Sequence, residues 1–386
     1  MRMLKQLLLS LAVLTSLGTL ACQGQVREPD QSSRRVLDAA LSDSGFARLI
    51  ERLSEPGGYF DTDNLISNEK SYLHVMGKMR KLGVKGGVYV GVGPDQNFSY
   101  IAQVRPNLAF MIDIRRDNLL EHFMFKAAFE LADNRIEYLC LLFGCTPPND
   151  TLDWTRKNVG ELADYVDEVG SDPTGAAAAR ESILSEVQQF GLALADSDLA
   201  TIDRFHKAFV DVGLELRFTS FYRGPQWYYP SYRDLLLERD LAGRQTNYLA
   251  NEDDFRFLKT MQQKNLVIPV VGDLAGDHAL KAIGEYVADH GERISAFYVS
   301  NVEFYLVRQG AFDRFAETVT HLPVDDRSVI IRSLFNRRRA YRRHPQSVPG
   351  YGSTQLLQTL SSFIDEYRRG GYRTYWDIVT KHLLDP

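Results

Sequence analysis

Two glycines and an aspartate are the residues of this chain whose types and spacing most clearly permit ligand chemistry. Gly91 and Gly93 lie in the stretch "GGVYVGVGPDQNFSY" (86–100), and Asp113 ends the next apolar run, twenty residues after Gly93. In a parallel α/β sheet, glycines after the first strand let a ligand approach the backbone, and an acid after the second strand accepts ribose hydroxyls. The spacing predicts a site for an adenosine-type ligand. The alternative is that the glycines only allow a strand and a helix to pack closely.

The details of this loop argue against a pyrophosphate-containing dinucleotide. Gln96 stands at the third glycine position, and Pro94 lacks a backbone N–H that could bind a phosphate. The segment "YVGVG" resembles the first motif of S-adenosylmethionine-dependent methyltransferases, acid-x-Gly-x-Gly, with Tyr89 in place of the acid. The resemblance implies that S-adenosylmethionine is the cofactor, with Asp95 or Asn97 compensating for the missing acid.

Polar residues also follow two apolar runs in the second half of the chain. Asp273 ends "VIPVVGD", and Asn301 ends "ISAFYVSN". Since ligands of open α/β sheets bind outside the carboxyl ends of the strands, these residues are expected to converge on the glycine loop. In a methyltransferase arrangement Asp273 would contact the adenine amine, and Tyr298, Asn301 and Glu303 would orient the acceptor for in-line transfer. The alternatives are a turn or helix N-cap for Asp273 and core packing for Tyr298.

Two further segments are candidates for closing this site. Asn64 and Glu69 lie in "DTDNLISNE", just before the first strand, and are expected either to line the pocket or to begin a helix. Trp227 and Tyr228 belong to the aromatic loop "GPQWYYP", which we expect to cover the acceptor.

The elements that would position these residues alternate between strands and helices. Short apolar runs predict strands at 86–92, 108–114, 266–273, 294–301 and 328–335, and helical patterns include 98–106, 278–291 and a single long helix over 117–144. Mostly helical sequence at about 150–265 interrupts this order. The pattern predicts an α/β fold with a Rossmann-like, mostly parallel, methyltransferase-like sheet and a helical insertion.

Several blocks of the chain resemble an uncharacterised bacterial and plant family with a Rossmann-like, methyltransferase-related fold. These blocks are "LSEPGGYFDTDNLISNE", "YVGVGPDQNFSYIA", "AFMIDIRRDNL", "PVVGDLAG" and "FYVSNVEFYL". The resemblance runs from about residue 45 to the C-terminus, outside much of the insertion. It implies a fold and an S-adenosylmethionine-type pocket, without an established reaction or substrate.

The N-terminus has the features of a bacterial export signal. Arg2 and Lys5 precede a short apolar run that ends in "TLAC", which resembles the lipidation motif of lipoproteins. We therefore expect a signal peptide at 1–21, a lipidated Cys22, a flexible tether at 22–35 and one folded domain at 36–386. The lipid would hold this domain on a membrane of the cell envelope; ordinary cleavage after Ala21 and secretion are the alternative.

An envelope location conflicts with a cofactor that is made and kept in the cytoplasm. The second hypothesis is therefore a non-catalytic envelope lipoprotein that uses the cleft, or the arginine run at 337–343, to bind another ligand or partner. The acceptor of a methyltransferase would be a small molecule or protein of unknown identity. The net charge of -5 gives no reason to expect nucleic acid, and the eight histidines show no metal-binding spacing.

Cys140 and Cys145 are expected to be two buried thiols, with a disulfide as the alternative.

Overall fold

The computed structural model describes residues 40–222, 224, 226, 228–335 and 343–385. The predicted signal peptide, Cys22, the tether, Trp227 and nearly all of the arginine run lie outside these described residues.

A seven-stranded sheet forms the centre of the described chain, in the order β3-β2-β1-β4-β5-β6-β7. The strands β1 to β5 run parallel, whereas β6 is antiparallel to β5 and β7 to β6. Their bounds are Val88–Gly91 (β1), Leu108–Asp113 (β2), Val267–Val271 (β3), Ile294–Ser300 (β4), Val329–Phe335 (β5), Ser353–Thr359 (β6) and Leu383–Leu384 (β7). The predicted α/β class with a mostly parallel sheet is confirmed.

The strand order creates a switch point beside β1. The chain moves outward from β1 to β2 and β3, and then crosses to the other side of β1 to form β4 and β5. Gly91 at the end of β1 pairs with Met111 in β2 and with Tyr298 in β4. Such switch points are where open α/β sheets leave room for ligands at the carboxyl ends of the strands.

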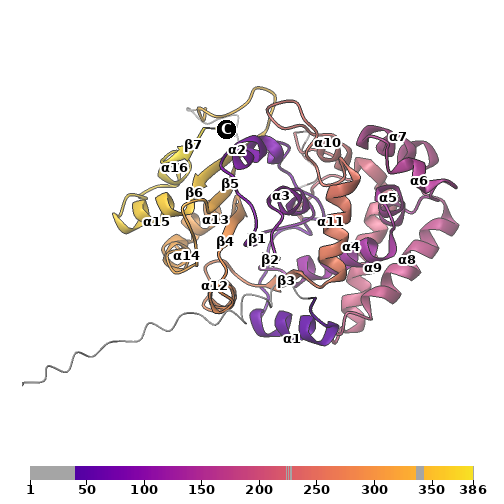
Figure 1. Cartoon of the computed structure of the whole chain (residues 1–386), viewed down its shortest axis with the longest axis horizontal. Coiled ribbons are helices and arrows are strands. Elements are labelled where there is room, and N and C mark those ends of the chain that lie inside the picture. Colours follow the sequence, from indigo (N-terminus) through magenta and orange to yellow (C-terminus); the bar gives the residue numbers. More distant parts are fainter. Residues whose placement is uncertain (1–39, 223, 225, 227, 336–342, 386) are drawn as a thin grey trace, which may run out of the picture.

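Helices cover both faces of the sheet (Figure 1). Tyr89 of β1 packs against Tyr100 of α3, whereas Phe110 of β2 packs against Tyr286 of α12. Because Tyr89 pairs with Ala109, the residue before Phe110, these two helices lie on opposite faces. The helices nearest the sheet are α1 (Asp43–Leu53), α2 (Met76–Lys81), α3 (Gln96–Val104), α4 (Arg116–Leu131), α12 (Ala279–Asp289), α13 (Val302–Gln309), α14 (Phe312–Val319), α15 (Leu360–Arg368) and α16 (Tyr375–Ile378), with the short 3₁₀ helix η2 (Tyr72–Val75).

The prediction of one long helix over 117–144 is wrong. α4 ends at Leu131 because Ala132 is extended, and Asn134 then caps a new helix, α5, by accepting a hydrogen bond from the Glu137 N–H at 3.1 Å. The expectation of two thiols is also wrong, since Cys140 and Cys145 form a disulfide. Gly144 ends α5 in the left-handed conformation and turns the chain back, which brings the two Cα atoms to 4.5 Å.

The chain between β2 and β3 is helical, as expected at about 150–265. Besides α4 and α5 (Arg135–Phe143), it contains α6 (Thr151–Trp154), α7 (Val159–Val169), α8 (Pro173–Val187), α9 (Asp196–Val212), η3 (Gly213–Glu215), α10 (Tyr232–Leu236) and α11 (Glu252–Gln263). Most of these helices form the right-hand side of the molecule in Figure 1. None of the described helices is long and apolar enough to cross a membrane.

Candidate functional site

The loop after β1 depends on its two glycines in different ways. A Cβ atom at Gly91 would lie 2.0 Å from Asn97 Oδ1 and 2.7 Å from the Tyr89 hydroxyl, so no side chain fits there. Gly93 has a φ of +88°, in the left-handed region that disfavours other residues. Gly91 is therefore required for packing, whereas Gly93 is required for the shape of the loop.

Asn97 and Tyr89 stabilise this loop through hydrogen bonds. Asn97 Nδ2 lies 3.0, 3.2 and 2.8 Å from the carbonyl oxygens of Val92, Gly93 and Pro94. The Tyr89 hydroxyl donates to Asn97 Oδ1 at 2.7 Å. Tyr89 thus stabilises the loop instead of contacting a ligand, and Asn97 is committed to the backbone rather than to the methionine end of a cofactor.

His122 of α4 also forms a hydrogen bond with the loop. Its Nε2 lies 2.9 Å from the Gly93 carbonyl oxygen, and because a carbonyl only accepts, Nε2 must carry the hydrogen. Burial lowers the pKa of His122 to about 4, so the ring is neutral at pH 7. This histidine was not among the predicted site residues, since it has no metal-type spacing to another histidine.

At the switch point, Glu69 is the centre of a buried hydrogen-bond network. The Tyr298 hydroxyl donates to Glu69 Oε2 at 2.5 Å, and the hydroxyls of Ser300 and Ser333 also bond the carboxylate. Burial raises the pKa of Glu69, although these hydroxyls lower it in part. The structure therefore brings together Tyr298 and Glu69, two residues selected from sequence.

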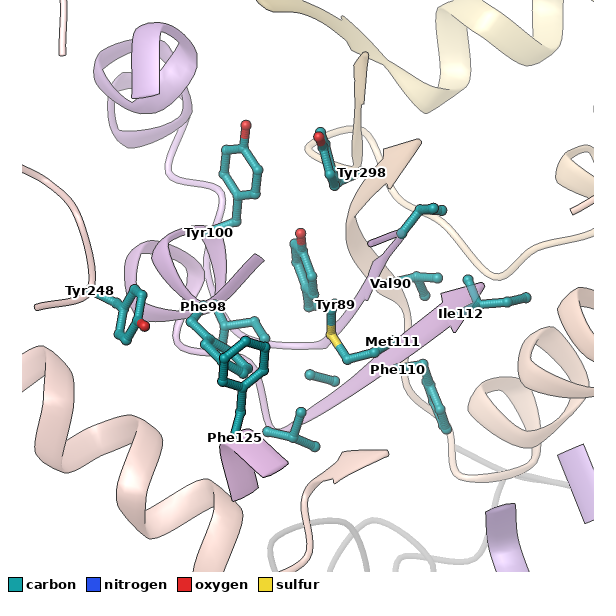
Figure 2. Packing of buried hydrophobic residues seen from close by; sticks show 14 of the residues in the cluster. Tyr89, Val90, Phe98, Tyr100, Phe110, Met111, Ile112, Phe125, Tyr248 and Tyr298 are labelled. Carbon is teal, nitrogen blue, oxygen red and sulfur yellow. The ribbon is translucent and has the colours of Figure 1, made fainter. Parts of the chain in front are cut away.

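The network continues through β6 to the helix that follows the glycine loop. Ser333 Oγ lies 2.6 Å from Gln355 Oε1, and Gln355 Nε2 donates to the Tyr100 hydroxyl at 2.9 Å. Tyr89, Tyr100 and Tyr298 lie side by side on this face of the sheet (Figure 2). These side chains fill much of the space in which a ligand at the switch point was expected.

The three predicted catalytic residues are not brought together. Glu303 is buried in an ion pair with Arg332, with 2.6 Å from Nε to Oε2. Since Arg332 and Ser333 are consecutive in β5, their side chains point to opposite faces of the sheet. Glu303 therefore lies on the face opposite Tyr298. Asn301 lies at the tip of β4, where its Oδ1 accepts a long hydrogen bond of 3.4 Å from Ser300.

Asp113 stands at the end of β2, as expected, but its carboxylate already has a partner. Arg115 Nε and Nη2 donate to the two Asp113 carboxylate oxygens at 3.1 and 2.9 Å, and both residues are buried. Arg115 also donates to the carbonyl oxygens of Thr62 (3.0 Å) and Asp63 (2.5 Å), which fastens the segment before β1 to this strand end. Ribose hydroxyls would therefore have to compete with Arg115 for the carboxylate oxygens of Asp113.

Asp273 and Asp95 likewise bond the protein itself. Asp273 Oδ1 accepts from the Ala275 N–H at 2.9 Å, which is the turn role given above as its alternative. Asp95 accepts hydrogen bonds from the hydroxyls of Tyr232 (2.9 Å) and Tyr248 (3.1 Å), and burial raises its pKa to about 6. The two tyrosines come from the helical insertion, more than a hundred residues away, so no local pattern pointed to them.

The remaining candidates lie in different places. Asn64 has a φ of +53°, and its Nδ2 would be 3.3 Å from a Cβ at Gly93, so it lies beside the glycine loop. Tyr228 is partly exposed and lies beside Gly352, before β6, rather than beside the glycine loop.

Two surface depressions in the described part of the chain lie away from the glycine loop. One, of about 190 Å³, lies between α1, α4 and β3 and is lined in part by Glu55, Gly57 and Arg116. The other, of about 210 Å³, lies on the insertion beside Gly213. Across the residues that the structure describes, no group of three His, Cys, Asp or Glu side chains is arranged to hold a metal ion.

The comparison with protein families agrees with a single fold over most of the chain. Residues 65–368 match a domain of unknown function, DUF7790, and the chain belongs to this family. The match begins just before Glu69 and includes every strand except β7. No curated protein matches the chain.

Proposed function

We propose that this protein binds an adenosine-type ligand at the loop formed by residues 91–96, with S-adenosylmethionine as the first candidate. The observation that carries the proposal is the loop itself. It lies at the switch point of a mostly parallel sheet, Gly93 adopts a left-handed conformation there, and Asn97 and His122 fix its carbonyl groups. Binding would take place outside the strand ends, above the filled space around Tyr298.

Binding without catalysis is better supported than methyl transfer. Glu303 is paired with Arg332 on the far face, and the Tyr298 hydroxyl is engaged by Glu69. Of the three predicted catalytic residues, Asn301 is the one whose side chain has only a long hydrogen bond of 3.4 Å, to Ser300. Methyl transfer to a small-molecule or protein acceptor remains the second candidate, and it would rest on positioning by Asn301.

The proposal includes an envelope location, through a lipid on Cys22 or through secretion. The Cys140–Cys145 disulfide supports it, since structural disulfides persist in oxidising compartments. In such a compartment the ligand would be S-adenosylmethionine, S-adenosylhomocysteine or a related nucleoside that has left the cytoplasm.

Calorimetric titration of the purified chain with S-adenosylmethionine and S-adenosylhomocysteine tests the proposal. Gly93→Ala adds a side chain where Asn64 and Gln96 lie within 3.4 Å, at a left-handed position. Gly83→Ala is the matched control, because Gly83 has a φ of +66° with nothing within 4 Å of an added Cβ. We expect a micromolar Kd that weakens at least tenfold in Gly93→Ala and is unchanged in Gly83→Ala. Absence of binding of both compounds to the unaltered chain would refute the proposal.

A further inference from the structure

Three buried polar atoms around the glycine loop have no hydrogen-bond partner among the described residues. They are Gln96 Oε1, Glu121 Oε1 and His122 Nδ1. Their side chains belong to residues that are only 5%, 0% and 2% exposed. Because unpaired buried polar atoms are costly, a bound group that hydrogen-bonds these three atoms near one loop would be stabilised.

These residues are close to one another in space. Gln96 Nε2 lies 3.4 Å from the position of a Cβ on Gly93, and His122 Nε2 lies 2.9 Å from the Gly93 carbonyl oxygen. Glu121 adjoins His122 in α4 and lies near enough to Asp95, Asp113 and Arg115 for their charges to affect its pKa. The three side chains thus border the region between the β1 loop and the end of β2.

The chemistry of the three atoms is well defined. His122 Nδ1 carries no hydrogen, because Nε2 donates to Gly93, so it can only accept. The Gln96 amide donates through Nε2 to the Tyr298 hydroxyl at 3.3 Å, which leaves Oε1 as an acceptor. Burial raises the pKa of Glu121 well above its ordinary value, which favours the neutral carboxyl, a group that can both donate and accept. The nearest partner of Glu121 is Asn118, at 3.5 Å.

The surroundings select against a phosphate. The arginines at the start of α4 and the arginine that bonds Asp63 are already paired: Arg115 with Asp113, Arg116 with Asp198, and Arg204 with Asp63 and Asp117. The carboxylates of Asp113 and Asp63 would also repel an anion. Two acceptors, and a carboxyl whose neutral form burial favours, instead match hydroxyl groups, which donate and accept at the same time.

We propose that Gln96, Glu121 and His122 form a subsite for the ribose hydroxyls of a nucleoside-type ligand that carries no phosphate. The subsite takes over the hydroxyl recognition expected of Asp113, whose oxygens are bonded by Arg115. The identification of the sugar as the ribose of an adenosine-type ligand rests on the proposed function above. The hydroxyl-binding character rests on the three side chains alone.

Competition among ligands on the full, unaltered chain is the first test, because it needs no variant to fold. We expect adenosine to bind at least tenfold more tightly than 2′,3′-dideoxyadenosine, and adenosine 5′-monophosphate to bind no more tightly than adenosine. Equal affinity of adenosine and its dideoxy analogue, or clear preference for the monophosphate, would overturn the subsite while leaving the proposed function in place.

Variants then locate the effect. Gln96→Met removes Oε1 at similar volume, and Glu121→Leu removes the carboxyl; Gln103→Met is the control, since Gln103 is in the same helix as Gln96 but bonds Arg80 at 2.9 Å. Both test variants should lose the preference for adenosine over the dideoxy analogue, and the control should keep it. If both test variants kept the preference for adenosine over the dideoxy analogue, the polar atoms of Gln96 and Glu121 would bond only ordered water, which contradicts the proposal.

A ribose titration separates failure of the subsite from failure of the proposed function. The melting temperature of the full chain is measured with millimolar D-ribose, and with Mg²⁺ or Zn²⁺ alone. Stabilisation by ribose that disappears in Glu121→Leu, without binding of any adenosine compound, would support the subsite and refute the proposed function. Stabilisation by a metal ion alone that disappears in Glu121→Leu would overturn the subsite in favour of a cation site.

Discussion

Glu69 and Glu303 are two buried carboxylates that contact β5 from opposite faces of the sheet, yet their partners differ in kind. Glu303 bonds the guanidinium of Arg332, whereas Glu69 is surrounded by the neutral hydroxyls of Tyr298, Ser300 and Ser333. Burial raises the pKa of Glu69, so neutral donors compensate only part of its desolvation. One face of the sheet is thus closed by a charge pair and the other by a polar network that favours a neutral acid.

This comparison explains why the predicted catalytic residues separate. Glu303 is in α13, just after β4, and bonds Arg332, whereas Tyr298 shares its partner Glu69 with Ser333. Because Arg332 and Ser333 are consecutive in β5, they point to opposite faces of the sheet and so do their partners. Tyr298 belongs to the face that carries the glycine loop, and Glu303 belongs to the face covered by α13 and α15. We therefore propose that the ligand binds on the Tyr298 face.

The largest expected effect comes from breaking the charge pair. Arg332→Leu leaves the Glu303 carboxylate buried without its cation, and we expect a loss of about 3–5 kcal/mol in the free energy of unfolding. The double variant Arg332→Leu/Glu303→Leu should recover most of this loss, because no unpaired charge remains. Denaturant unfolding measures both, and equal losses in the single and double variants would contradict the pairing.

Asp95 gives a pH-dependent effect of intermediate size. Burial raises its pKa from 3.8 to about 6, so its contribution to the free energy of unfolding is greatest below about pH 4 and is lost as the pH rises through 6. The difference amounts to roughly 3 kcal/mol, since one pKa unit corresponds to about 1.4 kcal/mol. Asp95→Asn should remove this dependence. Denaturant unfolding of both proteins between pH 4 and 7 would contradict the assignment if their difference stayed constant.

The smallest expected effect is the loss of one neutral donor from Glu69. Tyr298→Phe removes the 2.5 Å hydrogen bond, and we expect a loss of about 1 kcal/mol because two serine hydroxyls still bond the carboxylate. Tyr286→Phe is a suitable control, since Tyr286 is only half-buried. A loss of unfolding free energy from Tyr298→Phe as large as that from Arg332→Leu would contradict the difference between a charge pair on one face and a network of neutral donors on the other.

The strands β1 to β5 could be predicted because each is a mostly apolar run, although Arg332 and Ser333 interrupt β5. β6 was not predicted, since Ser353, Gln355 and Gln358 are polar, and only the fold reveals that they are buried. The break between α4 and α5 depends on Asn134 as an N-cap, a local signal that the long apolar pattern concealed.

The candidate site was predicted in part. The glycine loop could be predicted because it follows the first strand. Asn64 and Glu69 could be predicted as its neighbours because they lie shortly before that strand. The partners of Asp95 and the support from His122 could not be predicted, because Tyr232, Tyr248 and His122 reach the loop only through tertiary packing. The ion pair of Asp113 and Arg115 had a sequence signal, namely an arginine two residues after the acid.

The most direct test of the central claim is a crystal structure of the chain grown with saturating S-adenosylhomocysteine. We predict ligand density at the strand ends, against the Gly93 loop and within reach of Gln96 and His122. Ligand density in the depression between α1 and β3, or a loop without ligand at saturating concentration, would contradict the assignment of this loop as the binding site.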